Sequence, residues 1–116
     1  MFRIKRAYAP PGPEDGTRVL VDRLWPRGLA KDAAAVDLWL KDIAPSKELR
    51  QWFGHDPARW KGFTAKYLKE LEAPERAAAF ERLREMGRGR AKVTLLFGAR
   101  EETYNHAALL HRLLSE

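Results

Sequence analysis

Two uninterrupted apolar runs constrain the fold of this chain more than any other feature. The first is Val19 to Val21, inside a strand predicted from Arg18 to Trp25, and the second is Val93 to Phe97. Strands that are apolar on both faces are typical of sheets covered on both sides. The long segment between the two runs has mostly helical patterns, so it forms a crossover and the two strands are expected to be parallel.

The other elements are predicted from periodicity and capping residues. Phe2 to Ala7 alternates apolar and basic residues, as a half-exposed strand does, and the Pro/Gly-rich residues 10–16 form a loop. Helices are predicted from Ala33 to Ala44, after the N-cap Ser46, after Asp56 and Pro57, from Pro74, and from about Glu101 to Leu114. The helix after Asp56 is expected to bury Trp60, Phe63, Tyr67, Leu68 and Leu71. The predicted fold class is therefore α/β, a small, mostly parallel sheet of about three strands with helices packed around it, in a single domain over residues 1–116.

Composition excludes several classes of chemistry. The chain has no cysteine, so disulfides, thiolate metal sites, iron–sulfur clusters and a cysteine nucleophile are ruled out. Its apolar stretches are far shorter than the roughly 20 residues that cross a bilayer, and Arg3, Lys5 and Arg6 interrupt any leader-like start. We expect a cytoplasmic protein without a membrane partner. Abundant Arg, Glu, Ala and Leu beside a single Asn and a single Gln resemble a thermophile composition.

The net charge of +6 makes anionic partners plausible. Nucleic acid, nucleotides and phosphorylated metabolites all qualify, and the alternative is an Arg-rich surface whose charge has no function. No helix-turn-helix, RRM, KH or zinc-finger signature is present, so only the charge supports nucleic acid.

Polar residues follow both apolar strands at the point where each strand ends. Ligands of open α/β sheets bind outside the carboxyl ends of the strands, where strand-to-helix loops converge. The segment from Asp22 to Gly28 follows one strand, and the segment from Gly98 to His106 follows the other. If the strands are neighbours, the two segments share one pocket.

The candidate site residues come from these segments and from one turn between helices. Asp22 and His106 are the predicted acid and base, Asn105 would orient a substrate or water, and His55 would be an auxiliary donor. Arg23, Trp25 and Arg27 are the predicted ligand-binding residues, because two arginines beside a Trp suit a planar anion.

A structural role competes with each assignment. Asp22 can simply pair with an arginine, Trp25 can belong to the core, and His106 can be a hydrogen-bonded core histidine. Asp22, His55 and His106 could in principle hold a metal, but no two of them have helical ligand spacing, so neither a metal nor a cofactor is predicted.

Long motifs resemble the YeaO-like family of uncharacterised bacterial proteins, domain of unknown function 488. They are the segments 19–28, 38–46 and 49–60, followed by 93–97 and 105–107. The resemblance implies a small α/β fold in a bacterial cytosol and no known activity. A more distant branch looks similar at the same two places but carries a Cys-His pair in its last helix, where Asn105 stands here, which puts thiol chemistry in doubt for this chain.

Three functions remain open, and the sequence leaves unsettled whether the protein is an enzyme. The first is an enzyme or small-ligand binder for a phosphate- or nucleotide-like anion at the strand ends. The second is a basic module that associates with nucleic acid, and the third is a structural or interaction protein, as a monomer or homodimer.

Overall fold

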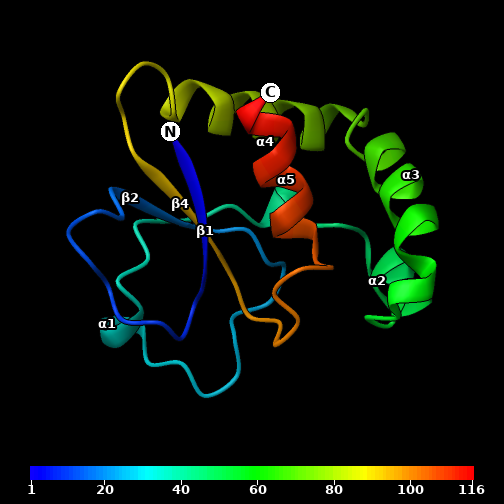
Figure 1. The fold of residues 1–116 in the computed structure, drawn as a ribbon, viewed down its shortest axis with the longest axis horizontal. Coiled ribbons are helices and arrows are strands. Elements are labelled where there is room, and N and C mark those ends of the chain that lie inside the picture. Colours follow the sequence, from blue (N-terminus) through cyan, green and yellow to red (C-terminus); the bar gives the residue numbers. More distant parts are fainter.

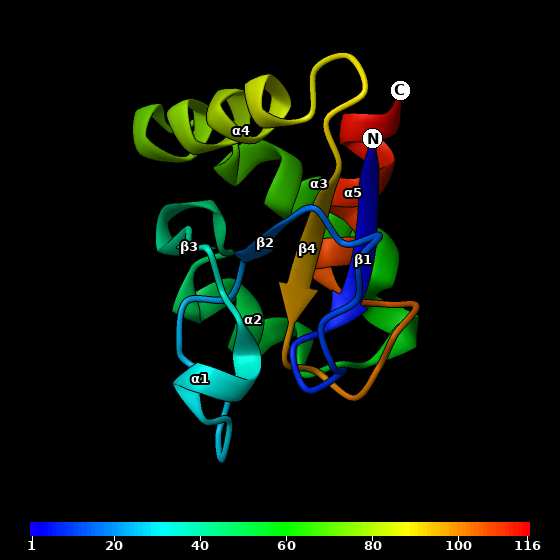
Figure 2. The same cartoon turned by 90° about the vertical axis from the view of Figure 1, so that its left-hand side faces the viewer.

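Four parallel strands form the sheet, in the order β1-β4-β2-β3. The computed structural model describes residues 1–116, with strands β1 (Phe2–Arg6), β2 (Thr17–Leu20), β3 (Leu38–Trp39) and β4 (Val93–Phe97). Figure 2 shows them side by side, with β4 between β1 and β2. The α/β class and the parallel pairing of the two apolar strands are confirmed, and β3 is an additional edge strand.

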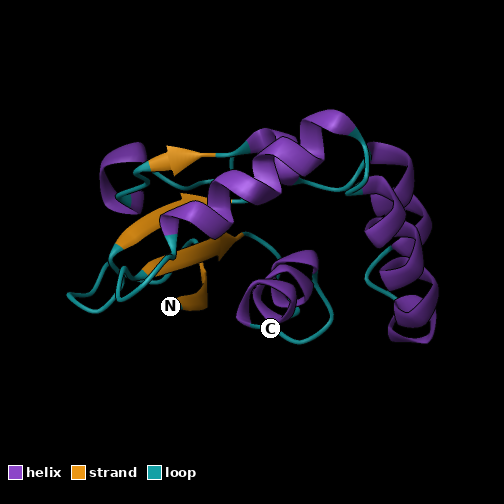
Figure 3. Cartoon of the chain, turned by 90° about the horizontal axis from the view of Figure 1, so that it is seen from above, coloured by secondary structure: helices purple, strands orange, loops and turns teal.

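The longer helices cover one face of the sheet, and α1 lies on the other side (Figures 1 and 3). The helical elements are α1 (Lys31–Ala34), η1 (Lys41–Ile43), α2 (Lys47–Phe53), η2 (Pro57–Arg59), α3 (Trp60–Glu70), α4 (Pro74–Met86) and α5 (His106–Ser115). None of them is long and apolar enough to cross a membrane. The predicted N-caps are confirmed, because Ser46 Oγ accepts from Leu49 N–H and Asp56 Oδ1 accepts from Ala58 N–H.

The apolar core is divided by the sheet into two clusters. Alternate strand residues point to opposite faces, so Val19 and Leu95 pack beneath the helices in the larger cluster. Leu20 and Leu96 point to the opposite face, where they pack with Ala7 in a smaller cluster covered by loops. Both apolar strands are therefore buried on two sides, as their composition predicted.

The helix predicted from Ala33 to Ala44 is wrong. Its apolar residues do not form one helical stripe, because Val36 and Trp39 pack in the smaller cluster while Leu40 and Ile43 pack in the larger one. The chain is helical only at the two ends of this range, in α1 and η1, and the extended residues between them serve both faces of the sheet. They are held as the edge strand β3 by backbone hydrogen bonds to β2, such as the 2.9 Å bond from Leu40 N–H to the Leu20 carbonyl.

Three smaller expectations are also corrected. The second strand ends at Leu20, although Val21 N–H still donates to the Leu96 carbonyl. The terminal helix begins at His106 rather than near Glu101, because the Glu101 carboxylate accepts the Thr103 and Tyr104 N–H groups and holds a turn. Leu68 is 41% exposed on the outer side of α3 and is not part of the core.

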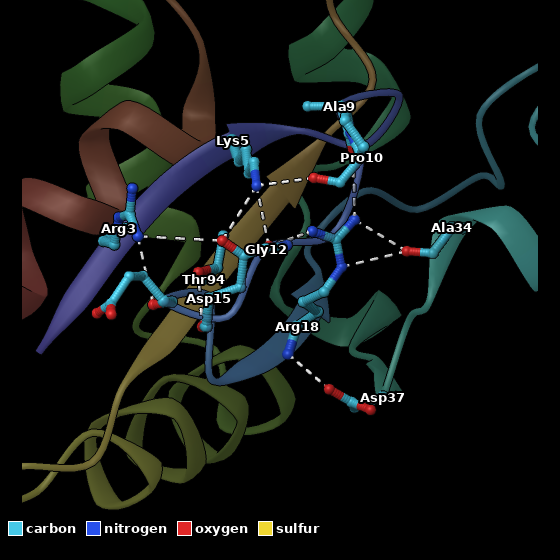
Figure 4. Close-up of polar contacts among 11 residues, drawn as sticks. Arg3, Lys5, Ala9, Pro10, Gly12, Asp15, Arg18, Ala34, Asp37 and Thr94 are labelled. Atoms are coloured by element: carbon cyan, nitrogen blue, oxygen red, sulfur yellow. Dashed lines mark hydrogen bonds and ion pairs between the residues drawn. The ribbon is translucent and has the colours of Figure 1, made fainter.

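A buried ion cluster stabilises the face of the sheet that lacks long helices (Figure 4). Asp15 Oδ2 accepts from Arg18 Nη1 at 2.6 Å, from Lys5 Nζ at 3.0 Å and from Gly12 N–H at 3.0 Å. The Thr94 hydroxyl donates to the Asp15 carbonyl at 2.7 Å. The cluster therefore ties the Pro/Gly loop to β1, β2 and β4.

The same cluster also anchors α1. The Arg18 guanidinium donates to the Ala34 carbonyl through Nε at 3.2 Å and Nη2 at 2.9 Å. Burial alone would raise the pKa of Asp15, but the hydrogen bonds from Lys5, Gly12 and Arg18 outweigh it and lower the pKa to about 2. The resulting stabilisation is present above the unfolded carboxyl pKa of about 3.9 and is lost as the pH falls through about 2.

Replacing Asp15 by Asn is expected to destabilise the protein by about 3 kcal/mol. The side chain of Arg18 is only 4% exposed and would be left as a buried cation without a carboxylate. Denaturant unfolding of Asp15→Asn measures the loss. The control is Glu14→Gln, which removes an exposed partner of Lys92 and is expected to change little. Equal stability of the two variants would contradict the structural role of the cluster.

Gly16 is the glycine that the loop before β2 requires. Its φ is +62°, and a Cβ at this position would lie 2.2 Å from the Lys92 carbonyl oxygen. Both the backbone conformation and the close approach of the β4 entry exclude a side chain.

Gly16→Ala is therefore expected to cost more stability than Gly28→Ala. Gly28 has a similar φ of +76°, but nothing lies within 4 Å of its Cβ position, so Gly28→Ala carries only the conformational cost of about 1 kcal/mol. The difference between the two unfolding free energies isolates the clash with Lys92. Similar losses of unfolding free energy in both variants would show that the loop moves away from Lys92 without cost.

Candidate functional site

A cavity of about 470 Å³ opens beside the carboxyl ends of β2 and β4. It is lined by residues that follow β2, by the segment from η1 to the turn after α2, by one residue of α3 and by residues that follow β4: Asp22, Arg23, Leu24, Ala44, Pro45, Lys47, Arg50, Gln51, Phe53, His55, Phe63, Ala99, Asn105 and His106. The parallel pairing of β2 and β4 creates the site, because it brings the two strand exits to one edge of the sheet.

Five predicted site residues meet in this cavity: Asp22, Arg23, His55, Asn105 and His106. Trp25 and Arg27 lie elsewhere. The Trp25 ring packs edge-on against Trp39 at 5.4 Å in the smaller core cluster. Arg27 is exposed, and its backbone carbonyl accepts from the Tyr8 hydroxyl.

Asp22 connects the two strand exits. Its Oδ2 accepts the Gly98 N–H at 2.8 Å, and its Oδ1 lies 3.4 Å from His106 Nε2. The approach to Gly98 is close, since a Cβ there would lie 3.0 Å from Asp22 Oδ2 and the carboxylate would have to shift. The carboxylate therefore has one oxygen held by the backbone and one beside an imidazole.

His106 is a neutral donor in this arrangement. Its Nε2 lies 3.0 Å from the Val21 carbonyl oxygen, which can only accept, so Nε2 carries the hydrogen. Burial lowers the pKa of His106 below its usual value, and this effect outweighs the raising effects of Asp22 and the Val21 carbonyl. Arg50 and His55 lower the pKa further through their charges.

Asn105 uses both ends of its amide as the N-cap of α5. Its Oδ1 accepts from Ala108 N–H at 2.9 Å, and its Nδ2 donates to the Glu101 carbonyl at 2.8 Å. The residue is 2% exposed. These contacts give the single Asn of the chain a structural role, with both the oxygen and the nitrogen of its amide engaged.

His55 lies in a strained turn at the cavity wall. Its φ is +56°, a left-handed conformation that is uncommon outside glycine, and it follows Gly54 at φ +54°. Its ring centroid lies 5.9 Å from that of Phe53. The turn after α2 thus holds an exposed imidazole beside the aromatic part of the cavity.

No sequence motif indicates the cations that α2 adds to the site. Arg50 and Lys47 both line the cavity, and the Nε of Arg50 is buried without any hydrogen-bond partner. No ion pair joins Arg50, Lys47 or Arg23 to a carboxylate. The spacing of three between Lys47 and Arg50 places them on one helix face, but only the packing of α2 shows that this face borders the strand ends.

Comparison with known proteins identifies the family. The family model described as "Inactive DUF488-N3 subclade" matches residues 1–116. The chain belongs to the DUF488 family. The resemblance to YeaO-like proteins is confirmed, because the uncharacterised protein YeaO of Escherichia coli is 42% identical over 94% of this chain and 92% of its own length.

An uncharacterised DUF488 relative from Mycobacterium tuberculosis is similar at 45% identity, over 97% of this chain and 92% of its own length. A relative from Mycobacterium bovis has the same identity and coverage. No solved structure matches the chain at a significant level. In this DUF488 domain no group of three His, Asp or Glu side chains is arranged to hold a metal ion.

The imidazole of His106 is expected to titrate below the usual pKa of about 6.5, because burial disfavours its charged form. The unfolded chain then binds a proton that the folded chain excludes, so this histidine lowers stability as the pH falls below about 6.5. Asp22→Asn is expected to lower the His106 pKa further, since it removes the nearby negative charge. NMR titration of the imidazole protons measures both values.

Glu81→Gln on the exposed face of α4 serves as the control for that titration. An unchanged or raised His106 pKa in Asp22→Asn would contradict the contact between the carboxylate and the ring.

Proposed function

We propose that this DUF488 domain binds a small anionic molecule in the cavity at the carboxyl ends of β2 and β4 and does not transform it. The observation that carries the proposal is the unpartnered Nε of Arg50 in the cavity wall. A buried donor without an acceptor costs about 1–3 kcal/mol, more when it is charged. Because this Nε is itself shielded, a carboxylate or phosphate bound in the cavity would compensate the charge of the Arg50 guanidinium through its terminal nitrogens.

The charge of the cavity supports an anion. Arg23, Lys47 and Arg50 approach it without carboxylate partners, whereas Asp22 is its only acidic residue. Arginine binds phosphate and carboxylate groups well because its planar donors match two oxygens at once. A cavity of about 470 Å³ also lies in the range of roughly 300–1,000 Å³ that small-molecule sites occupy.

Binding without catalysis is favoured by how the predicted acid and base are held. Nε2 of His106 contacts the Val21 carbonyl, and one oxygen of Asp22 accepts the Gly98 N–H, so both groups are engaged by backbone. Asn105 is engaged as a helix cap, and the chain has no thiol. The family description, which calls the subclade inactive, agrees with this proposal.

Arg50→Gln is expected to weaken the binding of inorganic phosphate at least tenfold, because one charge-assisted contact is lost, worth about 1.5 kcal/mol or more. Isothermal titration calorimetry at low salt measures the dissociation constants. The matched control is Arg84→Gln, which removes the same charge from an exposed position on α4.

Equal losses of phosphate affinity in Arg50→Gln and Arg84→Gln would show that only the net charge of the protein matters. That result would overturn the cavity as the binding site. An absence of phosphate binding by the wild-type protein, tested together with carboxylates such as citrate, would overturn the proposed function itself.

A further inference from the structure

A second cavity of about 540 Å³ adjoins the first, since three cations line both of them. The two cavities share Arg23, Leu24, Lys47 and Arg50, and the second adds Ser46, Glu48 and Arg76. The shared residues therefore lie between an inner compartment that contains Asp22 and Phe63 and an outer compartment that contains Arg76. No predicted site residue other than Arg23 belongs to the outer compartment.

The inner compartment suits an aromatic group. Phe53 and Phe63 line it with ring centroids 4.4 Å apart and planes inclined by 30°, and both side chains are almost fully buried. Ala44, Pro45 and Ala99 add further apolar surface. A flat ring can pack against such a wall and displace water from it.

Only the part of the inner compartment beside Asp22 disfavours an anion, and it favours a hydrogen-bond donor. The Asp22 side chain is 22% exposed, and its Oδ1 has only the 3.4 Å contact with His106. A negative ligand group beside this carboxylate would be repelled, whereas an N–H or O–H group would find an acceptor. The anionic part of a ligand must therefore lie away from Asp22.

The outer compartment has the opposite character. Four cations line it, Arg23, Lys47, Arg50 and Arg76, with Glu48 as the only carboxylate, and none of the four cations forms an ion pair. Arg76 is positioned by its Nε, which donates to the Ala44 carbonyl at 2.9 Å, so the terminal nitrogens of its guanidinium stay available. Several unpaired cations in one recess suit a phosphate group.

Building on the proposed binding function, we propose that the ligand is a phosphorylated heteroaromatic molecule of the nucleoside monophosphate class, held in one orientation. Its ring lies against Phe53 and Phe63 and donates an N–H to Asp22. Its phosphate lies among Arg23, Lys47, Arg50 and Arg76. The different chemistry of the two adjoining cavities carries this inference, since no single small anion would use both.

The experiment compares inorganic phosphate, the four common nucleosides and their 5′-monophosphates by calorimetry with the full chain. At least one monophosphate is expected to bind tenfold or more tightly than phosphate and than its own nucleoside. Asp22→Asn is expected to weaken that monophosphate about tenfold while leaving phosphate binding unchanged or tighter. Arg76→Gln is expected to weaken the binding of both phosphate and the monophosphate, and Arg84→Gln is expected to weaken the binding of neither.

A second variant tests the aromatic part of the inner compartment independently, so that the result does not depend on the folding of Asp22→Asn. Phe53→Leu keeps an apolar side chain but removes the ring, so it is expected to weaken the monophosphate and spare phosphate. Thermal unfolding of each variant shows whether it is folded.

The outcomes separate this inference from the proposed function. If phosphate binds in an Arg50-dependent way but no monophosphate binds more tightly, the ligand class is overturned while anion binding stands. If Asp22→Asn weakens phosphate as much as the monophosphate, the orientation is overturned. If none of the probes and no carboxylate binds, the proposed function and this inference are both overturned.

Discussion

The parallel pairing of β2 and β4 is the constraint on which the rest of the structure depends. The ladder runs from Thr17 opposite Val93 to Leu20 opposite Leu96, and it joins segments from opposite ends of the chain. Parallel strands leave a sheet at the same edge, so the chain after β2 and the chain after β4 emerge together. The hydrogen bond from Gly98 N–H to Asp22 then closes the gap between the two exits.

The two faces of this sheet are stabilised by different interactions. Helices bury an apolar cluster on one face, whereas loops cover the other face, where they carry fewer apolar side chains. There the carboxylate of Asp15 pairs with both Arg18 and Lys5 and links the Pro/Gly loop to the strands. Glycine at position 16 allows the same loop to approach the entry to β4. Lys5 and Arg18 therefore have a structural role, in contrast to the unpaired cations at the cavity.

The core strands and several helix caps could be predicted because their signals are local. Ser46 and Asp56 cap helices through neighbours two or three residues away, and both were predicted correctly. The strand β3 within the segment 33–44 could not be predicted, because the apolar residues of this segment face two different clusters and only the edge of β2 selects an extended backbone there. The role of Arg50 could not be predicted for the same reason. Its side chain lines the cavity only because of where α2 packs in the fold.

The sequence by itself determined the α/β class, the two buried strands and the family, since continuous apolar runs and long motifs carry that information without tertiary contacts. It also placed Asp22 and His106 at one edge of the sheet, which their 3.4 Å contact now bears out. Only the tertiary structure decided which cations border that edge, which amide caps a helix, and that two cavities adjoin. Those properties arise between residues distant in the chain, where packing and charge, rather than local preference, determine the geometry.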